Sequence, residues 1–221
     1  MHLLLLLSIP IAILSSLSFI FHPNLTSLYI FNPTDLHALS QAAISLHGND
    51  TTLVVSHILS SLRSTHGRHI STTSSSSPEP WVFNNAGGAM GAMHIIHASL
   101  TEYLIIFGTP IGTEGHSGRH TADDYFHILK GEQLAYSPGK GSYEPERYPQ
   151  GSVHVLKRGQ VKQYRMAEGC FALEYARGFI PAMLGFGFMD TFSSTLDFWT
   201  LGVTVWLTGR EMVGNLLIGK I

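Results

Sequence analysis

Glu174 is the residue of this chain whose type and setting most strongly indicate chemistry. It lies in the otherwise apolar run Phe171-Ala-Leu-Glu-Tyr-Ala176, which is typical of a β-strand. An ionised carboxylate on a core-facing strand position costs several kcal/mol unless it is paired, hydrogen-bonded or protonated. Two interpretations follow: a structural ion pair with Arg177 or Arg119, or a pocket acid with a raised pKa that can transfer a proton.

A second group of polar residues lies upstream of Glu174. His116, His120, Asp123 and Asp124 precede the run Tyr125–Leu129, and Pro149-Gln-Gly-Ser-Val-His154 follows later. These two stretches resemble the signature stretches of cupin barrels, in which such side chains often bind a divalent metal. The histidine spacing departs from the His-x-His pattern that places both rings on one strand face. We therefore expect no metal.

The elements that must position these residues are mainly strands. From Trp81 onward, short runs rich in β-branched and aromatic residues alternate with Gly and Pro, which predicts a compact antiparallel barrel or sandwich. The expected strands include 103–107, 125–129, 152–156, 161–164 and 171–175. Before them, residues 33–43 and 53–62 are typical of two helices, and the segment 64–80, rich in Ser and Thr, predicts a surface loop.

Both ends of the chain indicate a membrane. Of the 221 residues, 44% are hydrophobic and only 13% are charged, which favours membrane association. The net charge of −2 and the lack of a basic cluster disfavour nucleic acid as a partner. Residues 3–21 carry no charge and nearly match the hydrocarbon core in length, which predicts a retained anchor over 1–22; a cleaved signal peptide is the competing interpretation.

Two apolar runs, 179–189 and 198–207, are too short to span a bilayer. Trp199 and Trp206 are spaced to lie on one helix face, and Trp favours the headgroup region, so we expect a helix pair lying on the membrane. The alternative is a buried pair of core helices.

Several longer motifs resemble one known family, which is shared by fungal sterol delta-8 to delta-7 isomerases and the animal sigma-1 receptor. These motifs are Trp81-Val-Phe-Asn-Asn-Ala-Gly-Gly-Ala-Met-Gly-Ala-Met93, His97-Ala-Ser-Leu-Thr-Glu-Tyr103, Gly115-His-Ser-Gly-Arg119, Leu173-Glu-Tyr-Ala-Arg-Gly178 and Asp190-Thr-Phe-Ser-Ser-Thr-Leu-Asp-Phe198.

The resemblance implies a mainly β fold with flanking helices. Its parts would be a transmembrane anchor (1–22), a helical segment and polar loop (23–80), a cupin-like β-barrel (81–178) and a membrane-associated helix pair (179–221). It also implies a single-pass protein of the endoplasmic reticulum membrane, in contact with membrane lipid and assembled as a homotrimer.

Within that family the stretch Arg119–Leu129 resembles the isomerase branch. In the receptor branch, an ungapped comparison puts the second ligand-binding carboxylate at Phe126, which cannot ionise. Asp123 or Asp124 must then supply the second acid beside Glu174, and adjacent strand residues point to opposite faces. Carried over residue by residue, the resemblance also implies that Tyr103, Met93 and Phe107 line the site.

The chemistry implied is the shift of a sterol double bond from C8–C9 to C7–C8, a fecosterol-to-episterol type of reaction in ergosterol-type biosynthesis. Glu174 and one of the two aspartates would transfer the protons, with Glu102 and His154 as supporting residues. The reaction is redox-neutral and transfers no group, so no cofactor is expected. The alternatives are a sigma-1-like ligand-binding receptor without turnover and a metal-dependent cupin.

Overall fold

The computed structural model describes residues 25–71, 80–139 and 143–221. The described residues begin with a 3-10 turn, η1 (Leu25–Leu28), and two helices, α2 (Pro33–His47) and α3 (Thr51–His66). A second 3-10 turn, η2 (Gly67–His69), follows α3. Both helices begin where the sequence provides a capping side chain. The Asn32 side chain accepts from the Thr34 amide ahead of α2, and that of Asp50 accepts from the Leu53 amide ahead of α3.

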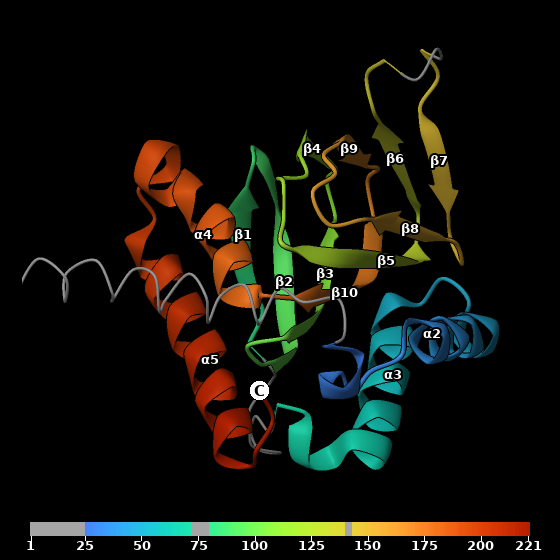
Figure 1. Cartoon of the computed structure of the whole chain (residues 1–221). Coiled ribbons are helices and arrows are strands. Elements are labelled where there is room, and N and C mark those ends of the chain that lie inside the picture. The colour runs from blue at the N-terminus through green and yellow to red at the C-terminus, as the bar shows by residue number, and fades with distance from the viewer. Residues whose placement is uncertain (1–24, 72–79, 140–142) are drawn as a thin grey trace, which may run out of the picture.

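Two antiparallel sheets form the centre of the molecule (Figure 1). In the described residues, one sheet has the strand order β1-β2-β3-β10-β5-β8 and the other has the order β4-β9-β6-β7. The strands are β1 (Val82–Ala86), β2 (Ala89–Ala98), β3 (Glu102–Thr109), β4 (Thr113–His116), β5 (Ala122–Lys130), β6 (Glu132–Tyr136), β7 (Glu146–Pro149), β8 (Val153–Leu156), β9 (Gln163–Met166) and β10 (Cys170–Gly178). The predicted mainly β fold with flanking helices is confirmed.

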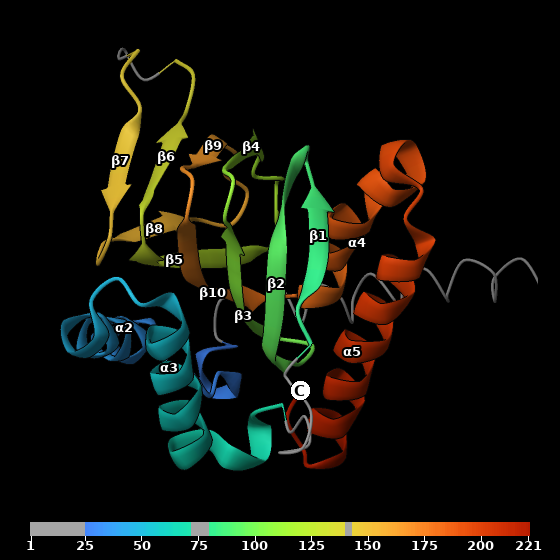
Figure 2. The same ribbon diagram turned by 180° about the vertical axis from the view of Figure 1, so that it is seen from behind.

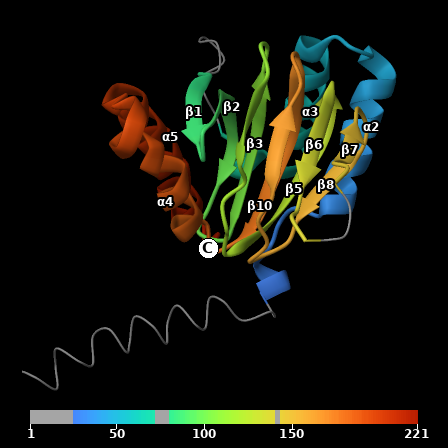
Figure 3. The ribbon, with the colours of Figure 1, turned by 90° about the horizontal axis from the view of Figure 1, so that it is seen from above.

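The chain closes with two helices, α4 (Ile180–Asp190) and α5 (Phe198–Leu217), joined by a π-helical turn, η3 (Thr191–Thr195). They lie beside β1 and β2, whereas α2 and α3 lie at the opposite side of the sheets, as the view from behind shows (Figure 2). Seen from above, the strands stand between the two helix pairs (Figure 3).

Alternation along the strands divides the apolar residues between two cores. On β10, Leu173 and Tyr175 point to the core beneath α2 and α3. Their neighbours Ala172 and Ala176 point into the core between the two sheets. Glu174 shares the face of these two alanines, so its strand position directs the carboxyl group into the space between the two sheets.

The expected anchor over 1–22 lies outside the described residues. Among the residues that are described, no helix is long and apolar enough to cross a bilayer. The long helix α5 leaves large apolar side chains in solvent on its outer face, with Trp199 at 83% and Trp206 at 67% exposure. The two tryptophans therefore do not belong to a buried core pair.

Candidate active site

Glu174 lies at the centre of a row of side chains that crosses the larger sheet. Its strand position pairs with Ile105 of β3 on one side and with Phe126 of β5 on the other. Phe126 pairs in turn with His154 of β8. All four side chains line one cavity that lies between the sheets and α4.

Asp124 reaches the same cavity from β5. Its register partner on β10 is Ala176, two residues beyond Glu174, so the two acids are diagonal neighbours on one face. Their carboxyl groups are joined by a side-chain hydrogen bond. Asp124 is buried, and one of its carboxyl oxygens, Oδ1, has no protein partner.

Burial raises the pKa of both carboxyl groups. For Glu174, removal from water is the largest cause, followed by the negative charge of Asp124 and the hydrogen bond between them. For Asp124, removal from water again raises the pKa most, and the hydrogen bond from Glu174 lowers it. The hydrogen bond thus raises the pKa of Glu174 and lowers that of Asp124. These opposite effects describe a pair that shares one proton, with the neutral Glu174 donating to Asp124.

Asp123 points away from the cavity, as strand alternation requires for the neighbour of Asp124. Its Oδ1 accepts from the Arg158 backbone amide at 2.9 Å, and its Oδ2 lies 3.9 Å from Lys157 Nζ. The sequence left two candidates for the second acid, and the structure brings only Asp124 to Glu174.

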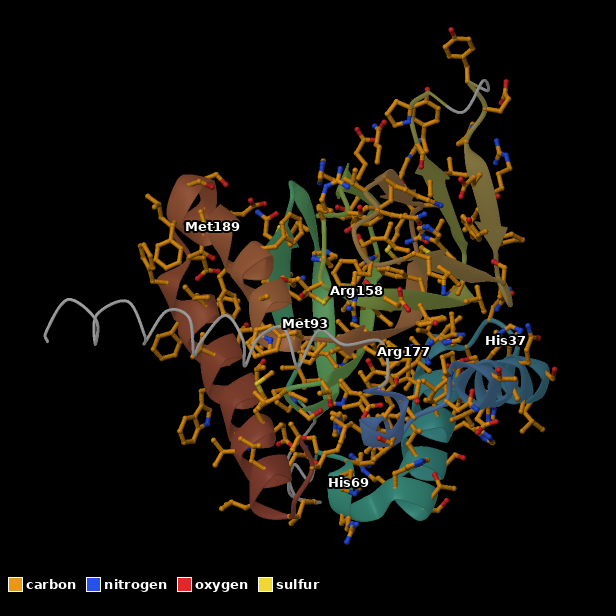
Figure 4. The ribbon with its side chains drawn as sticks, viewed as in Figure 1. His37, His69, Met93, Arg158, Arg177 and Met189 are labelled. Atoms are coloured by element: carbon orange, nitrogen blue, oxygen red, sulfur yellow. The ribbon has the colours of Figure 1, made fainter. Side chains whose placement is uncertain are left out.

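The three residues expected to contact substrate all line the cavity. Tyr103, Met93 and Phe107 come from β3 and β2, and the Tyr103 hydroxyl lies 3.3 Å from the Thr208 hydroxyl of α5. Burial raises the pKa of Tyr103 above its ordinary value, so the phenol stays neutral. Figure 4 shows Met93 among the strands, whereas Met189 lies on the helix pair, away from the strands.

Apolar side chains of α4 cover the remaining side of the cavity. They include Met183, Leu184 and Phe186. The wall of the cavity is mainly apolar, as is typical of sites that bind small molecules. The buried acid pair therefore faces a mainly apolar cavity.

His154 lies in the cavity wall together with Gln133, a residue that the sequence did not single out. His154 Nδ1 lies 2.7 Å from Gln133 Oε1, and the imidazole stacks on Tyr148 with ring centroids 4.5 Å apart. Burial, with Lys162 adding to it, lowers the pKa of His154 to about 4. The signal available in the sequence was the alternation of Gln133 with Ala135 in a short strand, which does not distinguish a cavity residue from a surface one.

Glu102 does not reach the cavity, although its neighbour Tyr103 does. Its carboxylate is fully buried on the other face of β3, where it accepts from the Phe31 amide and from the Tyr175 hydroxyl at 2.7 Å. Lys220 Nζ lies 2.9 Å from it. These interactions do not include Glu174 or Asp124, which Glu102 was expected to support. Strand alternation turns the Glu102 carboxylate toward the core beneath α2 and α3.

The histidines weighed as metal ligands are engaged in local hydrogen bonds. His116 Nδ1 accepts from the Gly118 amide, and His120 Nε2 lies 2.6 Å from the Ser117 carbonyl oxygen. Within the described residues, no three His, Cys, Asp or Glu side chains are grouped to hold a metal ion.

The chain combines a mainly β fold with flanking helices and a mainly apolar cavity that contains a buried acid pair. These features suit a hydrophobic small molecule held beside an acid. The chain belongs to the family described as "ERG2 and Sigma1 receptor like protein", whose profile matches residues 5–220. The resemblance seen in the sequence motifs is confirmed.

Named relatives fall into the two branches of that family. The C-8 sterol isomerase of Pyricularia oryzae is 63% identical over 95% of this chain and 93% of its own length. That of Aspergillus fumigatus is 59% identical, over 97% and 87%. The sigma non-opioid intracellular receptor 1 of Gallus gallus is 39% identical, over 86% and 80%.

Solved structures similar to this chain include cupins. A predicted oxalate decarboxylase from Thermotoga maritima is 16% identical, with a TM-score of 0.39 over 49% of this chain and 99% of its own. An RmlC-like cupin from Desulfovibrio desulfuricans is 20% identical, with a TM-score of 0.33 over 39% and 81%.

Proposed function

We propose that this chain is a sterol isomerase that moves a double bond from C8–C9 to C7–C8, as the names of its fungal relatives suggest. The observation that carries the proposal is the hydrogen-bonded acid pair, Glu174 and Asp124, in the wall of an apolar cavity. An alkene is a weak base, so its protonation needs a neutral acid held away from water.

The pair provides both halves of the reaction. The neutral acid delivers a proton to C9, and the two electrons of the C8–C9 double bond form the new C9–H bond, which leaves a cation centred on C8. A carboxylate then removes a proton from C7, and the electrons of that C–H bond form the C7–C8 double bond. One proton enters and one leaves, so the reaction is balanced without a further reactant.

The environment of the pair suits a cationic intermediate. Apolar walls such as Phe107 and Leu184 exclude water that would capture the cation, and the negative charge shared by the acids stabilises it. Tyr103 stays neutral beside them and cannot trap the cation as a phenolate. Ammonium-bearing compounds of sterol size are expected to inhibit, since they resemble the cation.

The membrane placement is also a proposal. The exposed apolar side chains of α5 support a helix pair resting on lipid. Because side chains of α4 line the cavity, an insoluble sterol could then enter it from the membrane. An anchor over residues 1–22, residence in the endoplasmic reticulum membrane as a single-pass protein, and assembly as a homotrimer stay predictions from the family resemblance.

Brominated lipids test that placement with an internal control. The chain has three tryptophans, of which Trp81 contacts His94 and Phe171 on the barrel. Three variants, each keeping one Trp and carrying Phe at the other two positions, would be compared in vesicles. Quenching of Trp199 and Trp206 well above that of Trp81 supports the placement, and equal quenching of all three contradicts it.

Sterol analysis tests the function itself. The purified full-length chain is incubated in deuterium oxide with a delta-8 sterol, and the product is examined by mass spectrometry. We expect a delta-7 sterol that carries one deuterium at C9. Tight binding of the sterol with no product would instead favour a receptor of the sigma-1 type, which its vertebrate relatives represent.

A further inference from the structure

At one end of the cavity, two buried side chains satisfy each other only in part. Gln133 of β6 is 0% exposed and His154 of β8 is 2% exposed. They share the hydrogen bond between His154 Nδ1 and Gln133 Oε1. His154 Nε2 and Gln133 Nε2 are both buried without a protein partner, and both residues line the cavity. A buried polar atom left unpaired costs free energy, so a group bound in the cavity is expected to satisfy these two.

The shared hydrogen bond fixes what each free atom can do. An amide oxygen only accepts, so His154 Nδ1 must be the nitrogen that carries the hydrogen. The low pKa of His154, caused by burial and by Lys162, keeps the imidazole neutral. His154 Nε2 is therefore an acceptor, and the free amide nitrogen of Gln133 is a donor. A hydroxyl group, which donates one hydrogen bond and accepts others, complements both atoms.

The register of the sheet places this donor and acceptor at a defined separation from the acid pair. Glu174, Phe126 and His154 are register partners on the neighbouring strands β10, β5 and β8. Strands lie about 4.8 Å apart, so the backbones of Glu174 and His154 are about 10 Å apart. The Phe126 side chain lies between them and stacks on the imidazole, with ring centroids 5.8 Å apart. The space between the Gln133–His154 pair and the acid pair is thus bounded by an aromatic ring.

A sterol has matching chemistry. Its 3-hydroxyl is on ring A, and the carbons C7, C8 and C9 belong to ring B, so a short rigid stretch of fused hydrocarbon separates the polar end from the reacting bond. We propose that Gln133 and His154 bind the sterol 3-hydroxyl and thereby set the register of the ring system against Glu174 and Asp124. The sterol side chain then extends toward Met183 and Leu184 of α4. This inference rests on the proposed function, since it assigns the polar end of its substrate.

A substrate comparison tests the assignment. A delta-8 sterol and its 3-deoxy analogue are assayed with the full-length protein and with Gln133→Met, which keeps the side-chain length but removes the donor. The wild-type protein should convert the hydroxylated sterol with a kcat/KM about 10–100-fold above that of the analogue, because the analogue leaves two buried atoms unpaired. Gln133→Met should lose most of that preference by a fall in kcat/KM for the hydroxylated sterol alone.

Two further variants separate recognition from folding. His154→Phe keeps the stacked ring and removes the acceptor, so it should lose the same preference. Asn84→Leu removes an amide from the wall of the cavity on β1, and its effect should be equal for the two sterols. Equal losses for both sterols in Gln133→Met and His154→Phe would overturn the proposal, as would a lost preference in Asn84→Leu alone.

Failure of the isomerase function is distinguishable from failure of this inference. If the wild-type protein converts neither sterol, the binding of the two sterols is compared by displacement of a fluorescent sterol. A hydroxyl preference in binding that Gln133→Met abolishes would support the inference without turnover. Equal binding of both sterols by the wild-type protein would overturn it.

Discussion

Asp124 and Glu174 face each other diagonally across the antiparallel pair β5 and β10, and a hydrogen bond joins their carboxyl groups. Each lies two residues from the register partner of the other, so both point into the same cavity. No basic side chain contributes to the pKa shift of either acid. A purely structural carboxylate would be expected to pair with a cation, so we propose that this acid pair keeps and moves a proton.

The two adjacent aspartates provide a matched test of this geometry. Asp124→Asn should lower turnover about 100–10,000-fold, which is the usual contribution of a general acid or base. Asp123→Asn should change turnover by less than about threefold, because Asp123 is a surface residue and an Asn oxygen can still accept from the Arg158 amide. The measurement is kcat with a delta-8 sterol for both variants. Equal losses would show that the side of the strand does not matter and would contradict the assignment.

The raised pKa values predict a pH-dependent effect on stability. A carboxyl group whose folded pKa lies above its unfolded value stabilises the protein fully below the unfolded pKa, near 4.3 for Glu, and that contribution is lost as the pH rises through the folded pKa. Glu174→Gln removes this loss. The Tm of Glu174→Gln should therefore exceed that of the wild-type protein, and the difference should be larger at pH 8 than at pH 5.

Comparing the two proteins at each pH cancels the opposite effect of buried histidines such as His127 and His154, whose lowered pKa values cost stability as the pH falls. A change of 1 kcal/mol moves the Tm of a chain of this size by about 2–4 °C. A Tm difference that is constant with pH, or one that shrinks between pH 5 and pH 8, would show that the pKa of Glu174 is not raised.

The buried pair of Glu102 and Lys220 predicts a purely structural effect. The Lys220 ammonium lies 2.9 Å from the Glu102 carboxylate and also donates to the Leu28 carbonyl oxygen. Lys220→Met should reduce the free energy of unfolding by about 3–5 kcal/mol, because it leaves a buried carboxylate without its cation. The double variant with Glu102→Gln should recover part of this loss in denaturant unfolding. A loss in Glu102→Gln/Lys220→Met equal to the sum of the two single losses would contradict a direct coupling.

Sequence patterns predicted most strands, but the strand expected over 161–164 lies at Gln163–Met166. They also could not choose the face of every residue. The apolar runs 103–107, 125–129 and 171–175 all lie within strands. Strand alternation predicted that the side chains of Asp123 and Asp124 point to opposite faces of the sheet. Because β5 has buried residues on both faces, the pattern did not show which face borders the cavity. The same ambiguity hid the position of Glu102, whose neighbours on both faces of β3 are buried.

Two other features depend on contacts between distant segments. The polar end of the cavity forms because β6 and β8, from different sheets, bring Gln133 and His154 together. Helix α5 continues for ten residues beyond the apolar run 198–207 that predicted it. There Glu211 accepts from the Ser71 hydroxyl, and Asn215 donates to the Ala98 carbonyl oxygen. No local pattern identifies either pair in advance.

Turnover by Glu174→Gln tests the central claim most directly. The glutamine keeps the size of the side chain but cannot give up a proton to an alkene, so the account predicts no detectable delta-7 sterol, and no deuterium at C9 when the reaction is run in deuterium oxide. Circular dichroism and a Tm at or above that of the wild-type protein would show that the fold is intact. Conversion of the delta-8 sterol by Glu174→Gln at near the wild-type rate would contradict the claim that this carboxyl group takes part in the proton transfer.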